Sequence, residues 1–310
     1  MILVVGGRGR LGTRVCERLS NEGRQVRVMT RTPEKAGHLR QLGAEIVKGD
    51  LRDPASVARA CQGTTYVVAA AHALGSKGSN NPRTVDGAGN RCLFDVAKCV
   101  RVKHLVFVSA LWASPNHALE FFRIKHGSEE YLRRSGISYT ILRATAFMET
   151  WTDVIGQAIL DDREATIFGP GTQPVNVISV EDVAHYVLVG LFNPEARDRT
   201  LELGGPENLS LNEVVATFER VLSRKAKCKH VPLLAMRLMR ALTRPFHGGR
   251  SRIMQLRIDM NTADWTFDPA KTFRNFPLDP TRLEDIARRL GAQEGSRTDD
   301  PETPVSAVVN

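Results

Sequence analysis

The sequence lacks a long apolar run, and it has few cysteines. Over its 310 residues no apolar stretch reaches the length of about 18 residues that a membrane-spanning helix requires. The five cysteines form no C-x-x-C pair, which disfavours a disulfide framework and suits a reducing cytosol. The N-terminal run, residues 1–5, has neither the positive start nor the cleavage site of a signal peptide. We therefore expect a cytoplasmic protein whose only membrane contact would be peripheral.

Acidic residues are missing from one long basic segment. The chain carries 43 Lys and Arg residues against 34 Asp and Glu, a formal net charge of +9. Residues 220–257 hold 11 of the basic residues and no acidic one, so the rest of the chain is slightly acidic, with 32 against 34. A protein that is basic throughout would suggest nucleic acid as a partner. Because the surplus is local and no helix-turn-helix or zinc pattern accompanies it, nucleic-acid binding is not expected.

The first half of the chain alternates short β-branched runs with segments of helical spacing. This alternation indicates βαβ units, whose right-handed crossovers build a doubly wound parallel sheet. We therefore expect an α/β fold of the Rossmann type, with residues 1–145 as a dinucleotide-binding domain. The expected strands are 1–5, 25–29, 44–47, 65–70, 103–108 and 138–142. The expected helices are 11–19, 33–42, 54–61, 85–100 and 119–134.

Beyond residue 145 the alternation loosens. We expect residues 146–293 to form a smaller C-terminal α+β lobe that covers the site and carries the basic segment. Strands are expected at 165–168, 176–178 and 200–203. Helices are expected at 180–192, 210–222, 232–244 and 278–290. Residues 294–310 are rich in Gly, Ser, Thr, Pro and Asp, which is typical of a mobile tail.

A glycine-rich loop follows the first expected strand directly and opens a helix. Its glycines allow the backbone N–H groups and the helix N-terminus to approach a pyrophosphate closely. The alternative is an ordinary strand-to-helix turn that binds nothing, but the strand–loop–helix context at the chain start favours a dinucleotide. The predicted cofactor-binding residues of this loop are Gly6, Gly7, Arg8, Gly9, Arg10, Leu11 and Gly12.

The end of the second strand predicts which dinucleotide binds. NAD-binding proteins usually carry an acidic residue there for the ribose 2′-hydroxyl, whereas this chain has Arg31. Together with Lys35 and Arg8 it offers positive charge suited to a 2′-phosphate, so NADP(H) is favoured over NAD(H). Lys35 could equally be a solvated helix residue.

Two further stretches complete the predicted cofactor site. Asp50 and Leu51 follow the third strand, where Asp50 could lie near the adenine amino group. Ala69 and Ala70 end the fourth strand and offer small side chains along the path of the adenosine. An aspartate at such a turn is also a common helix cap, and this alternative stays open for Asp50.

The order of the motifs resembles that of the NmrA-like atypical short-chain dehydrogenases/reductases. The matching segments cover roughly residues 1–290. They read GGRGRLG (6–12), TRTPEK (30–35), GDLRDP (49–54), HLVFVSA (104–110), SGISYTILRATAFME (135–149), VISVEDVA (177–184) and GGPENLSLNE (204–213). Residues 225–246 are similar to the branch of photosystem II assembly factors and to the related complex I accessory subunit. That similarity implies a nucleotide-binding assembly protein in a membrane context.

The resemblance assigns roles to three residues. Ser109 matches the serine that hydrogen-bonds the substrate carbonyl, and Lys125 matches the lysine that holds the nicotinamide ribose. Active members carry a tyrosine four residues before that lysine, where this chain has Phe121. Carbonyl reduction needs a proton for the developing alkoxide, and losing general acid–base help costs about 10²–10⁴ in rate.

Three outcomes of this substitution remain open. Lys125 could act as the acid/base, as the isoflavone-reductase-like branch implies. His117 or His126 could replace the tyrosine, although histidines on a helix face are more often plain surface groups. Or the site binds the cofactor without turnover, which we favour slightly. The expected function is thus an NADP(H)-binding regulator or assembly factor with weak or no catalysis. The alternatives are an NADPH-dependent reductase or isomerase of a small carbonyl or aromatic substrate, and a peripheral membrane binder with a vestigial nucleotide site.

The basic segment contains a helix pattern with two faces. Arg237, Arg240 and Arg244 share one face, which predicts contact with an anionic membrane surface or an acidic protein. Leu234, Leu238, Ala241 and Leu242 form an apolar strip beside them. The alternative is a lid helix whose apolar strip packs on the substrate pocket.

Substrate contacts are expected from three loops, and no metal site is expected. The loops are 72–82, 111–117 and 144–155, of which the last carries Phe147, Met148 and Trp151. These three side chains could line an apolar pocket or belong to the core. The eight histidines show no paired spacing of metal ligands.

Overall fold

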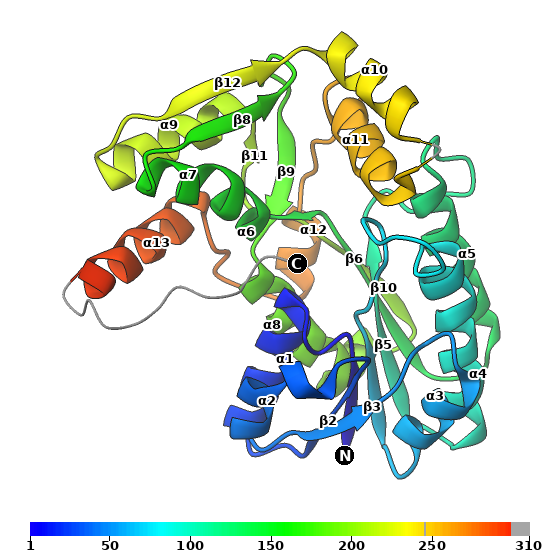
Figure 1. Cartoon of the computed structure of the whole chain (residues 1–310). Coiled ribbons are helices and arrows are strands. Elements are labelled where there is room, and N and C mark those ends of the chain that lie inside the picture. Colours follow the sequence, from blue (N-terminus) through cyan, green and yellow to red (C-terminus); the bar gives the residue numbers. More distant parts are fainter. Residues whose placement is uncertain (245, 299–310) are drawn as a thin grey trace.

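A parallel sheet of seven strands organises the chain. The computed structural model describes residues 1–244 and 246–298 (Figure 1). The strand order is β10-β6-β5-β4-β1-β2-β3, and every neighbouring pair is parallel. The strands are β1 (Ile2–Val5), β2 (Val26–Thr30), β3 (Glu45–Lys48), β4 (Tyr66–Ala69), β5 (His104–Ala110), β6 (Tyr139–Ala144) and β10 (Arg199–Leu203). The predicted doubly wound α/β fold is confirmed.

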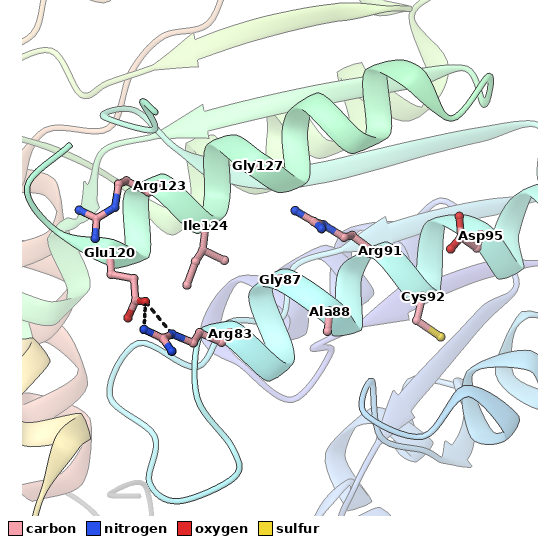
Figure 2. Close-up of a pocket in the computed structure, with 10 residues that line it drawn as sticks. All are labelled: Arg83, Gly87, Ala88, Arg91, Cys92, Asp95, Glu120, Arg123, Ile124 and Gly127. Atoms are coloured by element: carbon pink, nitrogen blue, oxygen red, sulfur yellow. Dashed lines mark hydrogen bonds and ion pairs between the residues drawn. The ribbon is translucent and has the colours of Figure 1, made fainter. Parts of the chain in front are cut away.

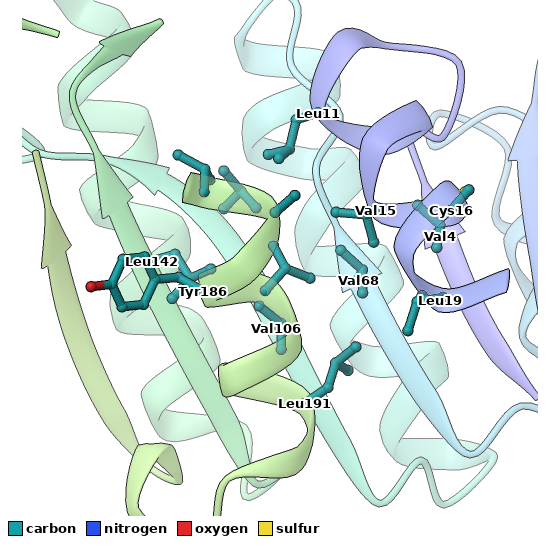
Figure 3. Close-up of a cluster of buried hydrophobic side chains, with 14 of the residues drawn as sticks. Val4, Leu11, Val15, Cys16, Leu19, Val68, Val106, Leu142, Tyr186 and Leu191 are labelled. Atoms are coloured by element: carbon teal, nitrogen blue, oxygen red, sulfur yellow. The ribbon is translucent and has the colours of Figure 1, made fainter. Parts of the chain in front are cut away.

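Helices cover both faces of this sheet, which explains why the central strands β1, β4 and β5 are largely apolar and buried. On one face lie α1 (Arg10–Asn21) and α8 (Val180–Phe192); on the other lie α3 (Pro54–Cys61), α4 (Asn90–Cys99) and α5 (Glu120–Arg134). Alternate residues of β1 therefore enter different cores: Val4 packs with α1 and α8, and Leu3 packs with α3 and α4. Figure 3 shows the first of these clusters, to which α1 contributes Val15 and α8 contributes Tyr186.

Two predicted helices differ from a regular α-helix. The segment 33–42 forms a 3₁₀ turn, η1 (Pro33–Lys35), and a short helix, α2 (Gly37–Gln41), because the backbone at Ala36 leaves the helical region. The segment 85–100 begins as a π-helix, η2 (Arg83–Gly89), before α4. A Cβ on Gly89 would lie 2.8 Å from the Cβ of Leu51, so glycine allows this turn to approach its neighbour.

The chain returns to the main sheet after residue 145. Helix α8 packs on it, and β10 forms its edge beside β6. The remainder forms the C-terminal lobe around two small sheets, β11-β9-β7 and β12-β8. Their strands are β7 (Ala146–Phe147), β8 (Glu164–Phe168), β9 (Val175–Ile178), β11 (Asn208–Leu209) and β12 (Lys227–Val231). The boundary at residue 145 stays a prediction, and it does not coincide with the end of the sheet.

The C-terminal lobe contains a long helix that the sequence pattern did not predict, beside the short unpredicted helices α6 (Met148–Trp151), α7 (Gln157–Leu160) and α12 (Ala270–Asn275). The long helix is α11 (Gly248–Met260), which starts with two glycines and spreads its apolar residues around its circumference. The other elements here are η3 (Thr152–Gly156), η4 (Pro194–Ala196), α9 (Leu211–Leu222), α10 (Leu233–Thr243) and α13 (Leu283–Thr298). Among residues 1–244 and 246–298, no helix combines the length and apolar character needed to cross a bilayer.

The predicted tail begins too early. Helix α13 continues to Thr298, so residues 294–298 are helical rather than part of a tail. The remaining residues of the predicted tail, 299–310, lie outside the described residues.

Candidate functional site

The glycine loop between β1 and α1 leaves the helix N-terminus open. Gly6 has a φ of +89°, and the N–H of Gly9 donates to the Gly6 carbonyl at 2.9 Å. A Cβ on Gly12 would lie only 2.2 Å from the Gly6 oxygen, so glycine is required there for loop and helix to touch. No described side chain caps the start of α1. Its first N–H groups are therefore available to an anion.

Three predicted cations of the dinucleotide site do lie together. Arg8 donates from Nε to the Lys35 carbonyl oxygen at 3.1 Å and from Nη1 to Thr32 Oγ1, which ties the glycine loop to η1. Arg8, Arg10 and Lys35 line a pocket of about 500 Å³. Arg10 also forms an ion pair with Asp153 of η3, so the C-terminal lobe reaches the glycine loop.

Arg31 lies beside that pocket rather than in its lining. It is exposed at the end of β2, and its charge contributes to lowering the pKa of Asp50. Two predicted cofactor-binding residues lie deeper. Leu51 and Ala69 are buried in the core beneath α3 and α4, which leaves Ala70 and the backbone beside it nearest the glycine loop.

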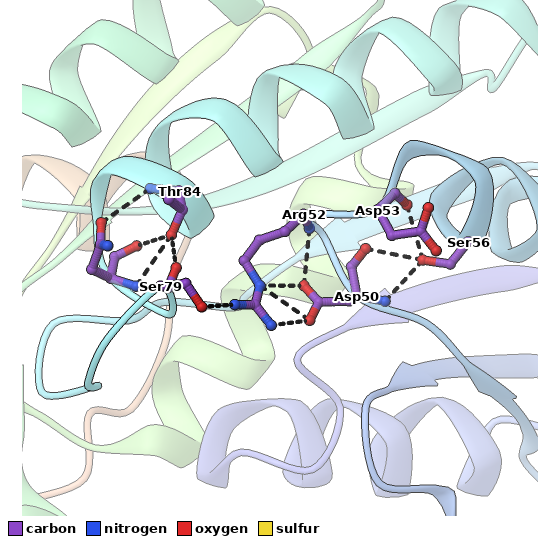
Figure 4. A network of polar contacts seen from close by, with 7 residues as sticks. Asp50, Arg52, Asp53, Ser56, Ser79 and Thr84 are labelled. Atoms are coloured by element: carbon purple, nitrogen blue, oxygen red, sulfur yellow. Dashed lines mark hydrogen bonds and ion pairs between the residues drawn. The ribbon is translucent and has the colours of Figure 1, made fainter.

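Asp50 is held by its own loop (Figure 4). Arg52 donates from Nε at 3.0 Å and from Nη2 at 2.5 Å to its two carboxylate oxygens, and it also reaches Ser79 Oγ at 2.8 Å. The hydrogen bonds from Arg52 are the main cause that lowers the pKa of Asp50. The loops after β3 and β4 are thereby tied together across the expected adenine end. Any contact of Asp50 with an adenine would have to coexist with Arg52.

Lys125 lies in a buried ion pair that the sequence did not predict. Its Nζ is 3.0 Å from Asp86 Oδ1 and donates to the Val108 carbonyl oxygen at 3.1 Å. The two side chains are 4% and 0% exposed. The second oxygen of Asp86 accepts the N–H of Ala73 at 2.9 Å, so the pair also holds the loop after β4. Each buried charge is thus compensated by the other.

Phe121 faces this pair, and His72 faces Phe121. The ring of Phe121 lies 5.7 Å from Lys125 Nζ, and its centroid is 6.5 Å from that of His72 in an edge-on arrangement. His72 is accessible, yet enough protein surrounds it that desolvation lowers its pKa, with a smaller contribution of the same sign from Lys125 and an opposing one from Asp86. No motif marked His72 individually, although it begins the predicted loop 72–82. His72 is thus an accessible group that can carry a proton, and it lies beside the Phe121 ring.

Ser109 belongs to a different buried network. Its hydroxyl donates to Glu129, whose carboxylate forms an ion pair with Arg143 at 2.6 Å. Ser109 and Lys125 are therefore held by two separate carboxylates, and the catalytic role predicted for each stays a prediction. Of the two alternative histidines, His117 stacks on Phe122 with centroids 4.4 Å apart, and burial lowers its pKa. His126 has a buried Nδ1 with no partner among the described residues.

The residues of the loop 144–155 divide between two cores. Met148 is fully buried in a cluster with Phe122 and Trp265, and Trp151 packs against that cluster. Phe147 packs instead against the core beneath α1 and α8. The core interpretation therefore describes Met148 better than a pocket-lining role.

An open groove of about 720 Å³ lies on the outer helical layer, between η2–α4 and α5 (Figure 2). Small residues such as Gly87, Ala88 and Gly127 form its floor. At one end Arg83 pairs with Glu120, Nη2 to Oε1, at 2.5 Å. The groove is away from the glycine loop, but it shares Arg83, Glu120 and Arg123 with a second cavity at the start of α5.

The arginines of α10 do not form one exposed face. Arg240 is half-buried, whereas Arg237 and Arg244, which directly follows the helix, are exposed. Arg240 and Arg244 line the second cavity, and Arg237 lies outside that lining. The apolar strip is turned outward: Leu234, Leu238 and Leu242 are 67%, 59% and 74% exposed. The lid interpretation is wrong, because the lid would have packed its apolar strip inward. The docking interpretation stays a prediction. Helix α10 is anchored instead by Met236, which is fully buried.

Comparison with known proteins now places this site in a family. The model of the NmrA-like family matches residues 1–286. The chain belongs to the NmrA-like family. Among curated relatives, photosystem II assembly factor Ycf39 of Trieres chinensis is 28% identical over 292 residues, covering 92% of this chain and 90% of the relative.

Solved structures confirm the fold over nearly the whole chain. The NADPH-dependent quinone oxidoreductase QOR2 of Escherichia coli, solved with NADPH, is 20% identical with a TM-score of 0.74. The triphenylmethane reductase of Citrobacter sp., solved with NADP(H), is 17% identical with a TM-score of 0.76. In both comparisons 94% of this chain and 99% of the other are covered.

Proposed function

We propose that this protein binds NADP(H) and acts as a regulator or assembly factor with weak or no reduction of small carbonyls. The observation that carries the proposal is the environment of Lys125. Phe121, where active relatives of the wider superfamily are expected to carry tyrosine, presents a ring without a proton. The lysine itself is fixed by Asp86 at 3.0 Å and by the Val108 carbonyl.

Cofactor binding is supported by the local geometry and by the relatives. The open N-terminus of α1 and the cations Arg8 and Lys35 offer what a dinucleotide phosphate requires. Two structural neighbours were solved with NADPH or NADP(H). The assembly role is supported by Ycf39, which carries that name and matches most of this chain.

A titration of NADPH against NADH, followed by cofactor fluorescence, tests the first part. We expect tighter NADPH binding, and Arg31→Ala should remove most of the preference. A charge-assisted hydrogen bond contributes about 1.5–3 kcal/mol, which corresponds to roughly 10- to 150-fold in affinity. Arg59→Ala, which changes an exposed arginine of α3 outside the pocket, is the matched control. Equal affinity of the unaltered protein for the two cofactors would contradict the NADP(H) assignment.

A second candidate is an NADPH-dependent reductase of a conjugated acceptor. Two observations favour it. The accessible His72 lies beside Phe121, and the ring centroids of Trp112 and Trp265 lie 4.0 Å apart in an aromatic cluster. An acceptor such as a quinone delocalises the charge left by hydride transfer and depends less on a strong proton donor than an alkoxide does.

Turnover measurements separate the two candidates. NADPH oxidation is followed with a quinone and with a small aldehyde. The regulator proposal expects no substrate-dependent oxidation of NADPH, and robust turnover of the aldehyde would contradict it. The reductase candidate expects Lys125→Ala to abolish turnover, while Phe121→Tyr leaves it intact or raises it. Cofactor binding of each variant is measured in parallel, so that loss of the cofactor is not mistaken for loss of chemistry.

A peripheral contact with an anionic membrane is a third candidate. It is supported by the outward-facing leucines of α10 and by exposed Arg237 beside them. Flotation with vesicles containing phosphatidylglycerol tests it. Leu238→Glu should abolish the association, and Arg59→Glu should not. Binding that is unaffected by Leu238→Glu would exclude this role for α10.

A further inference from the structure

The second cavity, of about 560 Å³, lies where the two halves of the chain meet. Its walls are the start of α5, the loop after β4 and the helices α10 and α11. Its polar lining includes Arg123, Arg240, Arg244 and Arg252, and its apolar lining includes Leu119 and Phe121. Gly249 fixes this junction, because a Cβ there would lie 2.4 Å from the Gly75 carbonyl oxygen.

The charge of this cavity is strongly unbalanced. Within the described part of the chain, five arginines line it and Glu120 is its one acidic residue. The carboxylate of Glu120 is already paired with Arg83. Four arginines, Arg123, Arg240, Arg244 and Arg252, therefore have no carboxylate within the lining. Such a concentration of like charge raises the local potential and attracts anions.

Two of these arginines are fixed in position, and one has an unused donor. Arg252 donates to the carbonyl oxygens of Leu74 at 2.9 Å and Ser76 at 2.7 Å, and desolvation lowers its pKa. Arg123 donates to the Ala118 carbonyl oxygen at 2.8 Å. Arg240 has a buried Nε without a hydrogen-bond partner among the described residues. A buried donor left unpaired is costly, and an entering oxygen atom would relieve that cost.

We propose that this cavity binds a small organic anion, with its phosphate or carboxylate group held by Arg240, Arg244 and Arg252. Guanidinium groups match the paired oxygens of both head groups. The lining also includes Leu119, Phe121 and Phe122, which suits an apolar or aromatic body. The ligand would therefore be amphiphilic, with one anionic end and one apolar end.

The ligand would end beside the expected nicotinamide position. Phe121 lines the cavity and also faces His72 and Lys125. A ligand that fills the cavity would thus place its apolar end against the ring of Phe121. The Asp86–Lys125 pair lies beyond that ring. The proposal stands apart from dinucleotide binding, which uses the glycine loop and a different pocket.

Calorimetric titration of the full chain with phenyl phosphate tests the proposal, with benzoate as the carboxylate arm and benzyl alcohol as the neutral arm. We expect saturable binding of at least one anion and none of the alcohol. Binding of phenyl phosphate would identify a phosphate head group, and binding of benzoate would identify a carboxylate. Arg240→Gln and Arg244→Gln should each weaken binding by about 10-fold, the scale of a lost charge-assisted hydrogen bond. The affinity of Arg240→Lys should lie between those of the unaltered protein and Arg240→Gln, because lysine keeps the positive charge but lacks the paired N–H donors of the guanidinium.

Arg237→Gln is the matched control, because it removes the same charge from the exposed side of α10. It should change the affinity less than 2-fold. Circular dichroism and the NADPH titration check the fold of each variant, and exposed Arg244 provides a second site if Arg240→Gln does not fold. Equal weakening by Arg237→Gln would overturn the proposal, as would displacement of the anion by NADPH or the absence of saturable binding to either anion.

Discussion

The molecule has two cationic regions, and they are assembled differently. Around the glycine loop, Arg8, Arg10 and Lys35 come from two neighbouring strand-to-helix connections. Around the second cavity, arginines come from η2, α5, α10 and α11, between 83 and 252 in the chain. The first region offers helix N–H groups and adjoins carboxylates such as Glu149 and Glu181, whereas the second has one carboxylate that is already paired.

The difference separates two kinds of anion recognition. A helix N-terminus recognises phosphate through the backbone and therefore depends on glycine more than on particular cations. A ring of arginines depends on guanidinium geometry and on the packing that brings distant helices together. Part of the surplus positive charge of the basic segment therefore lies in a cavity, because Arg240, Arg244 and Arg252 belong to its lining.

The largest expected effect concerns the buried pair between the two regions. Asp86→Asn leaves Lys125 as an uncompensated buried charge, and such losses typically cost 3–5 kcal/mol, so we expect a decrease of about that size in the free energy of unfolding. Urea denaturation measures it. Asp95→Asn, which removes an exposed carboxylate that accepts from Tyr131, is the control. A loss no larger than that of the control would mean that the Asp86–Lys125 pair does not stabilise the fold.

The next effect tests which face of α10 is buried beside the second cavity. Met236→Ala should destabilise the protein by about 2–5 kcal/mol, because this side chain is fully buried beneath α10. Leu238→Ala on the same helix should change stability by less than about 0.5 kcal/mol, because it is 59% exposed. Thermal and urea unfolding provide the measurement. The reverse order would show that α10 packs with its leucines inward and its arginines outward.

A smaller effect tests the dependence of the dinucleotide region on glycine. Gly12→Ala should cost about 1–3 kcal/mol, because its Cβ would meet backbone atoms of Gly6 and Gly7 within 2.5 Å. It should also weaken NADPH binding by at least about 10-fold while anion binding in the second cavity is unchanged. Gly37→Ala, where a Cβ meets nothing within 4 Å, is the control. Unfolding curves and the two titrations decide between these outcomes.

The smallest effect is a dependence on pH at Asp50. Its folded pKa is lowered, mainly by hydrogen bonds from Arg52, so the carboxylate contributes stability above its unfolded pKa of about 3.9 and loses it as the pH falls through the folded value. The stability difference between the unaltered protein and Asp50→Asn should stay below about 1 kcal/mol at pH 7, because the group is partly exposed, and should shrink as the pH falls below the unfolded pKa. Exposed Asp279→Asn is the control in urea unfolding across this range. A difference that grows toward low pH would contradict the lowered pKa.

The sequence predicted the elements that depend on local pattern. Helices Pro54–Cys61 and Val180–Phe192 begin and end where expected, since capping by Asp53 and Ser179 marks their starts. The glycine loop was recognisable because its spacing and its context are contiguous. Helix α11 was missed because its apolar residues follow no single face.

The candidate site was only partly predictable. Lys125 was identified, but its partner Asp86 was not, because 39 positions separate them and no periodicity links a π-helix to a later α-helix. His72 carried no motif of its own, and only the position of its loop beside α5 gives it a role. Arg240 and Arg244 were assigned to an outer face because a helical pattern defines faces without saying which one is buried.

What the sequence determined by itself is the doubly wound sheet and the glycine loop, since each depends on neighbouring residues. That Phe121 stands in the position of a tyrosine is what the resemblance to the family implies, and it stays a prediction. What only the tertiary structure decided is which charges meet: Asp86 with Lys125, Glu129 with Ser109 and Arg143, and the arginines of α5, α10 and α11 around one cavity. The physical reason is that Coulomb and hydrogen-bond energies act over a few ångströms, and distances in space between residues far apart in the chain are set by packing.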